Sequence, residues 1–588
     1  MIHSVTANRA SFKPVRLHSG LNVVLAERTT SASDRDSRNG SGKTSVVRII
    51  QWCLGSGAKA DHPFRVAPEL ASWSFTLTLD LRGQRVSVTR SVEDSSRVEF
   101  RGGDLEQLIP AARHSDEVTW LPVDEWRLEL GRLLFGLRAR EGASGATMPW
   151  PRALLNYLAR TEREAYISPF KYFGSQSAAE QQVQHAFLLG LDWNHPAKAK
   201  QLVDEGKDLR KGHVAITRSV AREHRIRPDS VEAELEARIV NLRQEVERRA
   251  KQLRGFHVVE QYRDIEVEAS ELTQQLHELA AANVADQQRI EFYVAAIEEE
   301  KPADLERLRR TYEEAGIVFG DQLTKRLEDV QGFHQQLILN RREYLDSEIV
   351  RLEIEIARRD KTKERLDDRR AQLMKVLEES GALDEYQELQ SQHAERVTRV
   401  ERLQVELDNL RRFETRLAEI RIEKQQLVLD ARRDFDARRG AIEEAIRIFG
   451  ENTDALYPEP GSLLIGVNRD GGYRLDYDIA KGESQGVQEM VVFAYDLMVA
   501  ELLSRHATKP GFLVHDSAIF DGVDERQRAR ALVLAERKAR ECGFQYLSLL
   551  NSDSIPTTDL PRDFKLADHT VLTLSDQGED GGLFGIRF

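Results

Sequence analysis

The sequence predicts an α/β domain that is interrupted by a long intramolecular antiparallel coiled coil. Three observations lead to this prediction. A glycine-rich loop, DSRNGSGKTS, follows a predicted strand near the start of the chain, from Asp36 to Ser45. The middle of the chain has no proline between Pro302 and Pro458 and repeats apolar residues at heptad spacing. Several strands are predicted near the end of the chain, and one of them, FLVHDS, runs into a carboxylate, Asp516.

The composition excludes several classes of protein. Of 588 residues, 31% are charged and 40% are hydrophobic, which suits a protein with cores and a long solvated element. The net charge of -13 gives no global attraction to nucleic acid, so a DNA contact would need a local basic patch. Two cysteines, Cys53 and Cys542, exclude a disulfide framework and a four-cysteine zinc site within one chain. No signal peptide and no membrane span are predicted, so we expect a cytoplasmic protein.

The N-terminal zone, residues 1–195, predicts strands followed by short helices. The stretch SFTLTLDLRGQRVSVTR alternates apolar and polar residues around an Arg-Gly-Gln turn, which is typical of a β-hairpin. LNVVLAER predicts a buried strand before the glycine-rich loop, and TSVVRIIQWCLG predicts a helix that ends at Gly55.

The middle zone predicts two coiled-coil arms. Two groups of apolar residues follow heptad spacing, namely Leu235, Ile239, Leu242, Val246 and Leu253, and Val400, Leu403, Leu407 and Leu410. A single long helix is disfavoured because such a seam needs a partner helix, and because EEAGIVFGDQL interrupts the pattern. We therefore expect an outgoing arm at 196–312, an apex at 313–345 and a returning arm at 346–445, each arm reaching at most roughly 170 Å. Gly255 and Gly381 are candidate elbows.

The C-terminal zone, residues 446–588, predicts strands at SLLIGV, YRLDYDI, GFLVHDS, FQYLSLL and HTVLTL, and helices at about 484–505 and 524–542. A coil that turns back on itself returns this zone to the N-terminal zone. Segments almost five hundred residues apart can then share one sheet and one site.

The glycine-rich loop carries the strongest chemical signal. Glycines let backbone N–H groups converge on phosphate oxygens, and the N-terminus of the following helix adds positive potential. Lys43 would contact the β- and γ-phosphates of ATP, and the Thr44 hydroxyl would bind Mg²⁺. The strict pattern requires glycine where Ser37 stands. The residues expected to bind the nucleotide are Asn39, Gly40, Ser41, Gly42, Lys43, Thr44 and Ser45.

Two further motifs complete the expected site. Asp516, at the end of a buried strand, is placed where a carboxylate commonly helps to bind Mg²⁺. In KGESQGVQEM, Ser484 and Gly486 begin a helix whose N-terminus could contact an anion, although Ser484 alone is also a plain helix N-cap.

With these motifs together, the chain resembles the ABC-type ATPases of the SMC, RecF and RecN group, in which a split head is joined by a coiled coil. NGSGKT resembles their Walker A motif, FLVHD their Walker B motif and ESQGVQ a degenerate signature motif. FDGVDERQ is similar to the D-loop, with Asp524 near its aspartate, and Asn551 stands near the switch position. The resemblance extends over most of the chain to a bacterial SMC-like family of defence systems, of the Lamassu type or the three-component ABC type, through stretches such as SPFKYF and the terminal LFGIRF.

The resemblance implies a mechanism. Two heads of a homodimer would enclose two ATP molecules, each held by Lys43 and Thr44 of one subunit and capped by Ser484 and Gly486 of the other. The implied partners are double-stranded DNA, a separate effector, expected to be a nuclease, and accessory subunits, with no membrane. Arg152, Arg160 and Lys171 are candidate DNA contacts, and each is also readily explained as a solvated or ion-paired residue.

This sequence departs from the group at two points, and one further motif, the Q-loop, is not located. Ser517 replaces the usual glutamate after Walker B, so we expect slow or partner-stimulated hydrolysis. Another group, namely His515, Asp521, Glu489 or Gln488, would then have to act on the attacking water, and His515 is named as a candidate catalytic residue beside Lys43 and Asp516. The apex has no Cys-x-x-Cys, so no zinc hook is expected. A Q-loop glutamine is not placed, since Gln51 lies on the helix after the loop.

The preferred function is an SMC-like ATPase that dimerises on ATP, senses DNA and controls an effector in anti-phage or anti-plasmid defence. One alternative is a RecF- or RecN-like repair or recombination ATPase, and another is a non-enzymatic coiled-coil scaffold. A simple kinase is disfavoured because it would not need its two motifs on opposite sides of a coil.

Overall fold

A computed structural model of the chain describes residues 1–27, 42–57, 62–115, 118–137, 148–255, 263–299, 321–378, 383–480, 482, 484–506, 508–557, 559–575 and 580–586. The chain divides into two compact units. The head contains Met1–Val203 and Glu423–Phe588, and the coil unit contains most of the residues between them. The two units are described separately.

The strands of the head form three sheets. An antiparallel sheet of seven strands has the order β2-β1-β4-β5-β6-β8-β7, a parallel sheet of five strands has the order β14-β3-β13-β12-β9, and β10 pairs with β11. Their bounds are β1 Ile2–Ala7, β2 Val15–Arg16, β3 Gly20–Glu27, β4 Ser74–Leu81, β5 Gln84–Ser91, β6 Arg97–Arg101, β7 Arg113–His114, β8 Thr119–Pro122, β9 Ala159–Arg160, β10 Ser462–Val467, β11 Tyr473–Asp478, β12 Phe512–His515, β13 Gln545–Asn551 and β14 Thr570–Ser575.

The predicted hairpin shows how local sequence sets a register. β4 and β5 alternate buried and half-buried residues, so one face of the pair joins the core. Leu81 pairs with Gln84 across a turn of two residues. Arg82 and Gly83 both have positive φ, as a type I′ turn requires.

The parallel sheet joins both ends of the chain. β3, from the first thirty residues, lies between β13 and β14, and β9 pairs with β12. All four ladders of this sheet are parallel, so the carboxyl ends of the strands meet at one edge. The predicted α/β head with a split sheet is therefore confirmed.

Helices cover these sheets, and most of their buried side chains belong to one hydrophobic core. The helices that lie mainly in the head are α1 Lys43–Cys53, α2 Pro63–Val66, α3 Leu105–Leu108, α4 Val123–Phe135, α5 Pro151–Leu158, α6 Ala178–Leu188, α13 Arg439–Leu456, α14 Gln485–Ser504, α15 Glu525–Cys542 and α16 Leu566–His569. α14 and α15 agree within about a residue with the helices predicted at 484–505 and 524–542.

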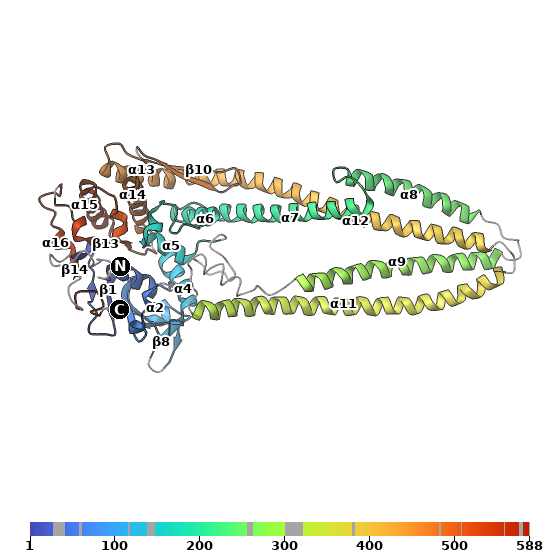
Figure 1. Cartoon of the computed structure of the whole chain (residues 1–588), viewed down its shortest axis with the longest axis horizontal. Helices are drawn as coiled ribbons and strands as arrows, with labels where there is room; N and C mark the ends of the chain where they lie inside the picture. Colours follow the sequence, from blue (N-terminus) through green and yellow to red (C-terminus); the bar gives the residue numbers. More distant parts are fainter. Residues whose placement is uncertain are drawn as a thin grey trace. The chain divides into compact units, whose positions relative to one another are not determined.

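The long helices are α7 Asn194–His224, α8 Val231–Arg254, α9 Arg263–Glu299, α11 Asp321–Glu378 and α12 Leu383–Ala437. Within the coil unit, α8 lies beside α12 and α9 lies beside α11 (Figure 1). Both pairs are antiparallel. Across α8 and α12, Glu236 contacts Arg411 and Glu245 contacts Arg396, so residue numbers rise on one helix and fall on the other.

The central part of the predicted heptad seam is buried, and Leu242 and Val400 pack against it partly buried. Leu235 and Ile239 pack with Leu403, Leu407 and Leu410 in one cluster. The antiparallel coiled coil is therefore confirmed in the described part of the chain, and burial of these positions between the two helices explains why they are apolar.

The predicted elbows and apex compare with the observed helix ends as follows. Gly255 is the C-cap of α8, while Gly381 lies outside the described residues. Of the predicted apex at 313–345, residues 313–320 also lie outside them, and 321–345 form the first part of α11. A break between α7 and α8, where Arg225 has positive φ, was not predicted. Within the described residues, the chain has no helix with the length and apolar character needed to cross a bilayer.

Candidate nucleotide-binding site

The candidate site lies at the carboxyl edge of the parallel sheet. β3 precedes the glycine-rich loop, β12 precedes Asp516, and β13 ends at Asn551. These strands are neighbours in the sheet, so residues separated by more than 450 positions in sequence come together here. Ligands of open parallel sheets bind at this edge.

The glycine-rich loop is described from Gly42 onward, and Ser37, Asn39, Gly40 and Ser41 lie outside the described residues. Gly42 is the N-cap of α1, with a φ of 76°. A Cβ at this position would lie 3.0 Å from the Leu583 side chain. Both the conformation and the tight contact therefore favour glycine. Ser45 is buried, and its N–H donates to the carbonyl of Gly42.

Lys43 connects the three strand ends. Its ammonium donates to Ser517 Oγ at 2.7 Å and to Asn551 Oδ1 at 2.5 Å. The Lys43 side chain is 8% exposed, so its charge is held at the sheet edge rather than in solvent. A fixed cation at the N-terminus of α1 suits the binding of a phosphate group.

Thr44 and Asp516 form the second contact. The Thr44 hydroxyl donates to Asp516 Oδ2 at 2.9 Å, and the Ser517 N–H donates to Asp516 Oδ1 at 2.7 Å. The Asp516 N–H donates to the hydroxyl of Tyr166. Asp516 is 5% exposed and has no cationic partner among the residues that the structure describes. A buried carboxylate beside a threonine hydroxyl provides the oxygen ligands that Mg²⁺ prefers, so these two residues fit the predicted metal site.

His515 corrects an expectation. Its ring is fully buried, with Nε2 3.0 Å from Asp496 Oδ2 and Nδ1 3.1 Å from the hydroxyl of Tyr546. Burial lowers the pKa of His515, and the neighbouring Asp496 acts in the opposite direction. Since side chains alternate along a strand, His515 points into the core beneath the sheet edge and not into the site. Its position is that of a core residue, not a catalytic one.

The start of α14 lies against the segment after Walker B. A Cβ on Gly486 would come within 2.5 Å of the Gly522 carbonyl oxygen, so only glycine permits this approach. Ser484 is the N-cap residue of α14, but its exposed side chain makes no capping hydrogen bond. The plain N-cap interpretation is therefore wrong for its hydroxyl. Asp524, in contrast, caps α15 by accepting from the N–H of Gln527.

The other carboxylates proposed to replace the missing glutamate are engaged elsewhere. Asp521 accepts hydrogen bonds from Arg163 at 3.1 and 3.3 Å. Glu489 is 5% exposed, accepts from Gln485 through Oε1, and leaves its buried Oε2 without a hydrogen bond. Burial, with a smaller contribution from the nearby Asp521, raises the pKa of Glu489 to about 7, against the lowering effect of the Gln485 hydrogen bond. Gln488 is half-buried in the first turn of α14.

A buried arginine, which sequence reasoning listed only as a possible DNA contact, organises the loop after β9. Arg160 is 1% exposed and forms two hydrogen bonds to the Asp496 carboxylate at 2.6 and 2.8 Å. The rest of its guanidinium donates to main-chain carbonyls of the loop, those of Ala165, Ser168, Pro169 and Lys171. Burial opposes its charge, but Asp496 outweighs that effect and the pKa of Arg160 is raised. Arg160 is therefore a core residue and not a DNA contact.

The two remaining candidate DNA contacts are half-buried. Burial lowers the pKa of Arg152, and the main-chain carbonyl of Lys171 accepts a hydrogen bond from Arg160. Gln51 donates to the carbonyl of Ala159 on β9. No residue pattern could have shown the Arg160–Asp496 pair, because the partners are separated by 336 positions.

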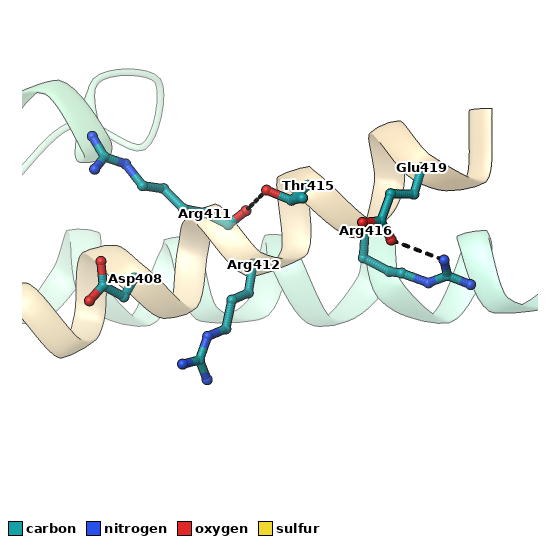
Figure 2. A pocket seen from close by; sticks show the side chains of 6 residues that line it. All are labelled: Asp408, Arg411, Arg412, Thr415, Arg416 and Glu419. Atoms are coloured by element: carbon teal, nitrogen blue, oxygen red, sulfur yellow. Dashed lines mark hydrogen bonds and ion pairs between the residues drawn. The ribbon is translucent and has the colours of Figure 1, made fainter. Parts of the chain in front are cut away.

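A pocket of about 390 Å³ lies on the coil unit, lined by Asp408, Arg411, Arg412, Thr415, Arg416 and Glu419, all from α12 (Figure 2). Arg416 pairs with Glu205 and Glu419, and Arg411 pairs with Glu236. These side chains extend along a solvated helix face and do not converge on a common point (Figure 2). The pocket is therefore a groove between paired charges.

Comparison with known families adds to this geometry. Residues 452–588 match a family described as an uncharacterised protein conserved in bacteria, DUF2326. Residues 290–404 match C-terminal domain 10 of the ABC-three component systems. The chain is similar to the SMC-like ABC-type ATPases of ABC-three component systems. The resemblance predicted from the motifs is confirmed. The DUF2326 match includes Asp516 after β12, Asp524 before α15 and Asn551 at the end of β13.

Two solved structures are similar over most of the chain. One is the Smc head domain with a coiled coil and joint from Pyrococcus yayanosii, with a TM-score of 0.33 and 12% identity, covering 99% of this chain and 96% of that chain. The other is the Smc head domain with an extended coiled coil bound to the C-terminal domain of ScpA, from Pyrococcus furiosus, with a TM-score of 0.28 and 11% identity, covering 94% of this chain and 90% of that chain. The fold assignment rests on the sheet and coil of this chain, not on these scores. No curated protein matches the chain.

Proposed function

We propose that the chain is an ATPase that binds ATP and Mg²⁺ at the edge of the parallel sheet. The observation that carries this proposal is the contact of Thr44 with Asp516 beside the Lys43 ammonium. Lys43 would contact the β- and γ-phosphates, and Thr44 and Asp516 would bind the metal. The bound metal would neutralise phosphate charge.

The expected turnover is slow. Ser517 stands where a carboxylate would activate water, and its hydroxyl accepts a hydrogen bond from Lys43. A neutral hydroxyl is a poor proton acceptor compared with a carboxylate. We therefore propose that hydrolysis is slow in the isolated chain and is accelerated by partners.

We further propose that ATP joins two heads. The exposed Ser484 hydroxyl and the N-terminus of α14 are available to the nucleotide of a second subunit, because α14 makes no use of that hydroxyl as a cap. Nucleotide contacts made only in the joined state would shift the equilibrium toward the dimer.

The similarity to ABC-three component systems supports a role with further subunits. We propose that the ATP-bound dimer senses double-stranded DNA and controls a separate effector, a nuclease, in defence against phages or plasmids. Reconstitution with the products of neighbouring genes would test this role, with effector activity compared with and without DNA at several salt concentrations. A chain that stimulates no partner but acts on DNA breaks or gaps would favour the repair alternative.

Nucleotide binding is the first experiment. The full-length wild type should bind ATP in the presence of Mg²⁺, and Lys43→Ala should weaken binding at least tenfold. Asp208→Asn, an exposed substitution on the coil, is the matched control and should bind as the wild type does. Absence of ATP binding by the wild type would favour the scaffold alternative.

A further inference from the structure

Ser517 stands where a second carboxylate would follow Asp516 after β12, so a carboxylate could come instead from the end of the neighbouring strand β9. β9 and β12 are parallel, with Arg160 aligned to His515. The Asp516 N–H lies 3.4 Å from the Arg160 carbonyl, which extends this register beyond the strand ends. Two residues beyond this aligned pair, Ser517 follows His515 after β12 and Glu162 follows Arg160 after β9. Neighbouring strands lie about 4.8 Å apart, so Glu162 follows β9 at the level that Ser517 occupies after β12.

The backbone at Glu162 is strained. Its φ is 66° and its ψ is 151°, in a region that residues with a side chain rarely adopt. A residue held there costs on the order of 1–3 kcal/mol and persists only when its surroundings fix it. Strain of this kind, where β9 ends beside Asp516, motivates the hypothesis that the position of this one side chain has a function.

The surroundings that fix Glu162 are the contacts of Arg160. The guanidinium donates to the carbonyls of Ala165 and Pro169 and to the Asp496 carboxylate, all of them buried. On the other side of the loop, the Tyr166 hydroxyl donates to the Arg160 carbonyl and accepts from the Asp516 N–H. The loop that begins with Glu162 is thus tied to the same residue, Asp516, that contacts Thr44.

The Glu162 carboxylate faces the helix of the phosphate loop. Its Oε1 lies 3.8 Å from the Arg48 guanidinium. Arg48 is one helical turn after Thr44 on α1, so the two side chains share a helix face. The Glu162 side chain is 38% exposed, so water reaches it while it stays paired with Arg48.

Other carboxylates near this edge are less suited. Asp521 is paired with Arg163, and Glu489 is buried on α14 beside Gln485. Glu164 belongs to the same loop but is exposed. Asp516 is committed to Thr44 and to the metal in the proposed site.

We propose that Glu162 is the general base for ATP hydrolysis in this chain, in place of a carboxylate at position 517. The inference rests on the proposed ATPase function. The oxygen of a water molecule forms a bond to the γ-phosphorus while the bond from that phosphorus to the bridging oxygen breaks. The electron pair of the broken bond remains on the β-phosphate of ADP, and the proton of the water passes to the Glu162 carboxylate.

The test compares Glu162→Gln with Glu164→Gln in the full-length chain. ATP binding and single-turnover hydrolysis are measured separately. Glu162→Gln should bind ATP within threefold of wild type and hydrolyse it about 10²–10⁴-fold more slowly. Glu164→Gln should match wild type in both measurements. If Glu162→Gln does not bind ATP, Glu162→Asp replaces it, with a carboxylate one methylene shorter that should bind ATP and lose at least tenfold in rate.

A second variant tests whether the loss of rate in Glu162→Gln comes from the missing carboxylate and not from a distorted structure. Ser517→Glu introduced into Glu162→Gln should recover at least tenfold in rate, because it returns a carboxylate to the same edge. Hydrolysis by Glu162→Gln at the wild-type rate would overturn the inference. So would a wild type that binds ATP but hydrolyses it no faster than Lys43→Ala, and nucleotide binding would then still stand. Failure of wild type to bind ATP at all would instead remove the proposed function.

Discussion

Replacement of Arg160 by methionine should destabilise the head strongly, because it removes a charge that the interior depends on. In Arg160→Met the Asp496 carboxylate, 1% exposed, would lose both hydrogen bonds from the guanidinium. Removal of one partner from a buried ion pair costs about 3–5 kcal/mol. The His515 ring beside Asp496 can compensate only in part, since burial lowers its pKa and so disfavours its charged form.

The loop after β9 adds to this cost. The carbonyls of Ala165, Pro169 and Lys171 would each lose a donor, and an unsatisfied buried carbonyl costs on the order of 1 kcal/mol. The total approaches the 5–15 kcal/mol that typically stabilises a whole domain. We therefore expect partial unfolding of the head or protease cleavage within 161–171, with loss of ATP binding.

The assay is urea denaturation followed by near-ultraviolet circular dichroism, together with limited proteolysis. Arg160→Lys, which keeps the charge but offers fewer donors, should fall between wild type and Arg160→Met. The double variant Arg160→Met with Asp496→Leu should be more stable than Arg160→Met alone, since it removes the orphaned carboxylate. A denaturation midpoint for Arg160→Met equal to that of wild type, or strictly additive effects in the double variant, would refute the reasoning.

Three further outcomes are expected. Gly486→Ala places a methyl group 2.5 Å from the Gly522 carbonyl oxygen, so the start of α14 must shift. We expect this overpacking to cost about 1–3 kcal/mol, which a lower melting temperature of the variant would show. Burial raises the pKa of Glu489 to about 7, so between about pH 4.5 and pH 7 the folded head holds a proton that the unfolded chain releases. The free energy of unfolding should therefore fall as the pH rises through this range, on the order of 1 kcal/mol per pH unit. Melting curves of Glu489→Gln should lack this contribution to the pH dependence. In the coil, Leu407→Ala should cost about 2–5 kcal/mol, whereas Val405→Ala, 48% exposed, should leave the helical signal on heating nearly unchanged.

Much of the head was predictable because its signals are local. The hairpin at 74–91 follows from alternation around a turn that contains Gly83, and the bounds of α14 and α15 were predicted to within about a residue. The heptad leucines identify the buried face of the coil because a helix presents every third or fourth residue to its partner. The loop-helix junction at Gly42 and Lys43 was likewise recognisable from spacing alone.

Other features depend on pairings between distant positions. His515 follows Val514 in a strand, and only the sheet shows that its ring points at Asp496. From the sequence, Glu162 cannot be told apart from the many other acidic residues. Its positive φ and its place beside β12 depend on strand pairing, which local sequence does not encode. Likewise, Arg160 looks like any surface arginine until its partner on α14 is known.

The sequence by itself therefore determined the element types, the coiled coil and the motif residues Lys43, Thr44 and Asp516, since these depend on the spacing of neighbouring residues. Only the tertiary structure decided which of them meet and which side chains are buried. The physical reason is that a parallel sheet aligns strands from both ends of the chain, and hydrogen bonds and buried charges are then satisfied across hundreds of residues.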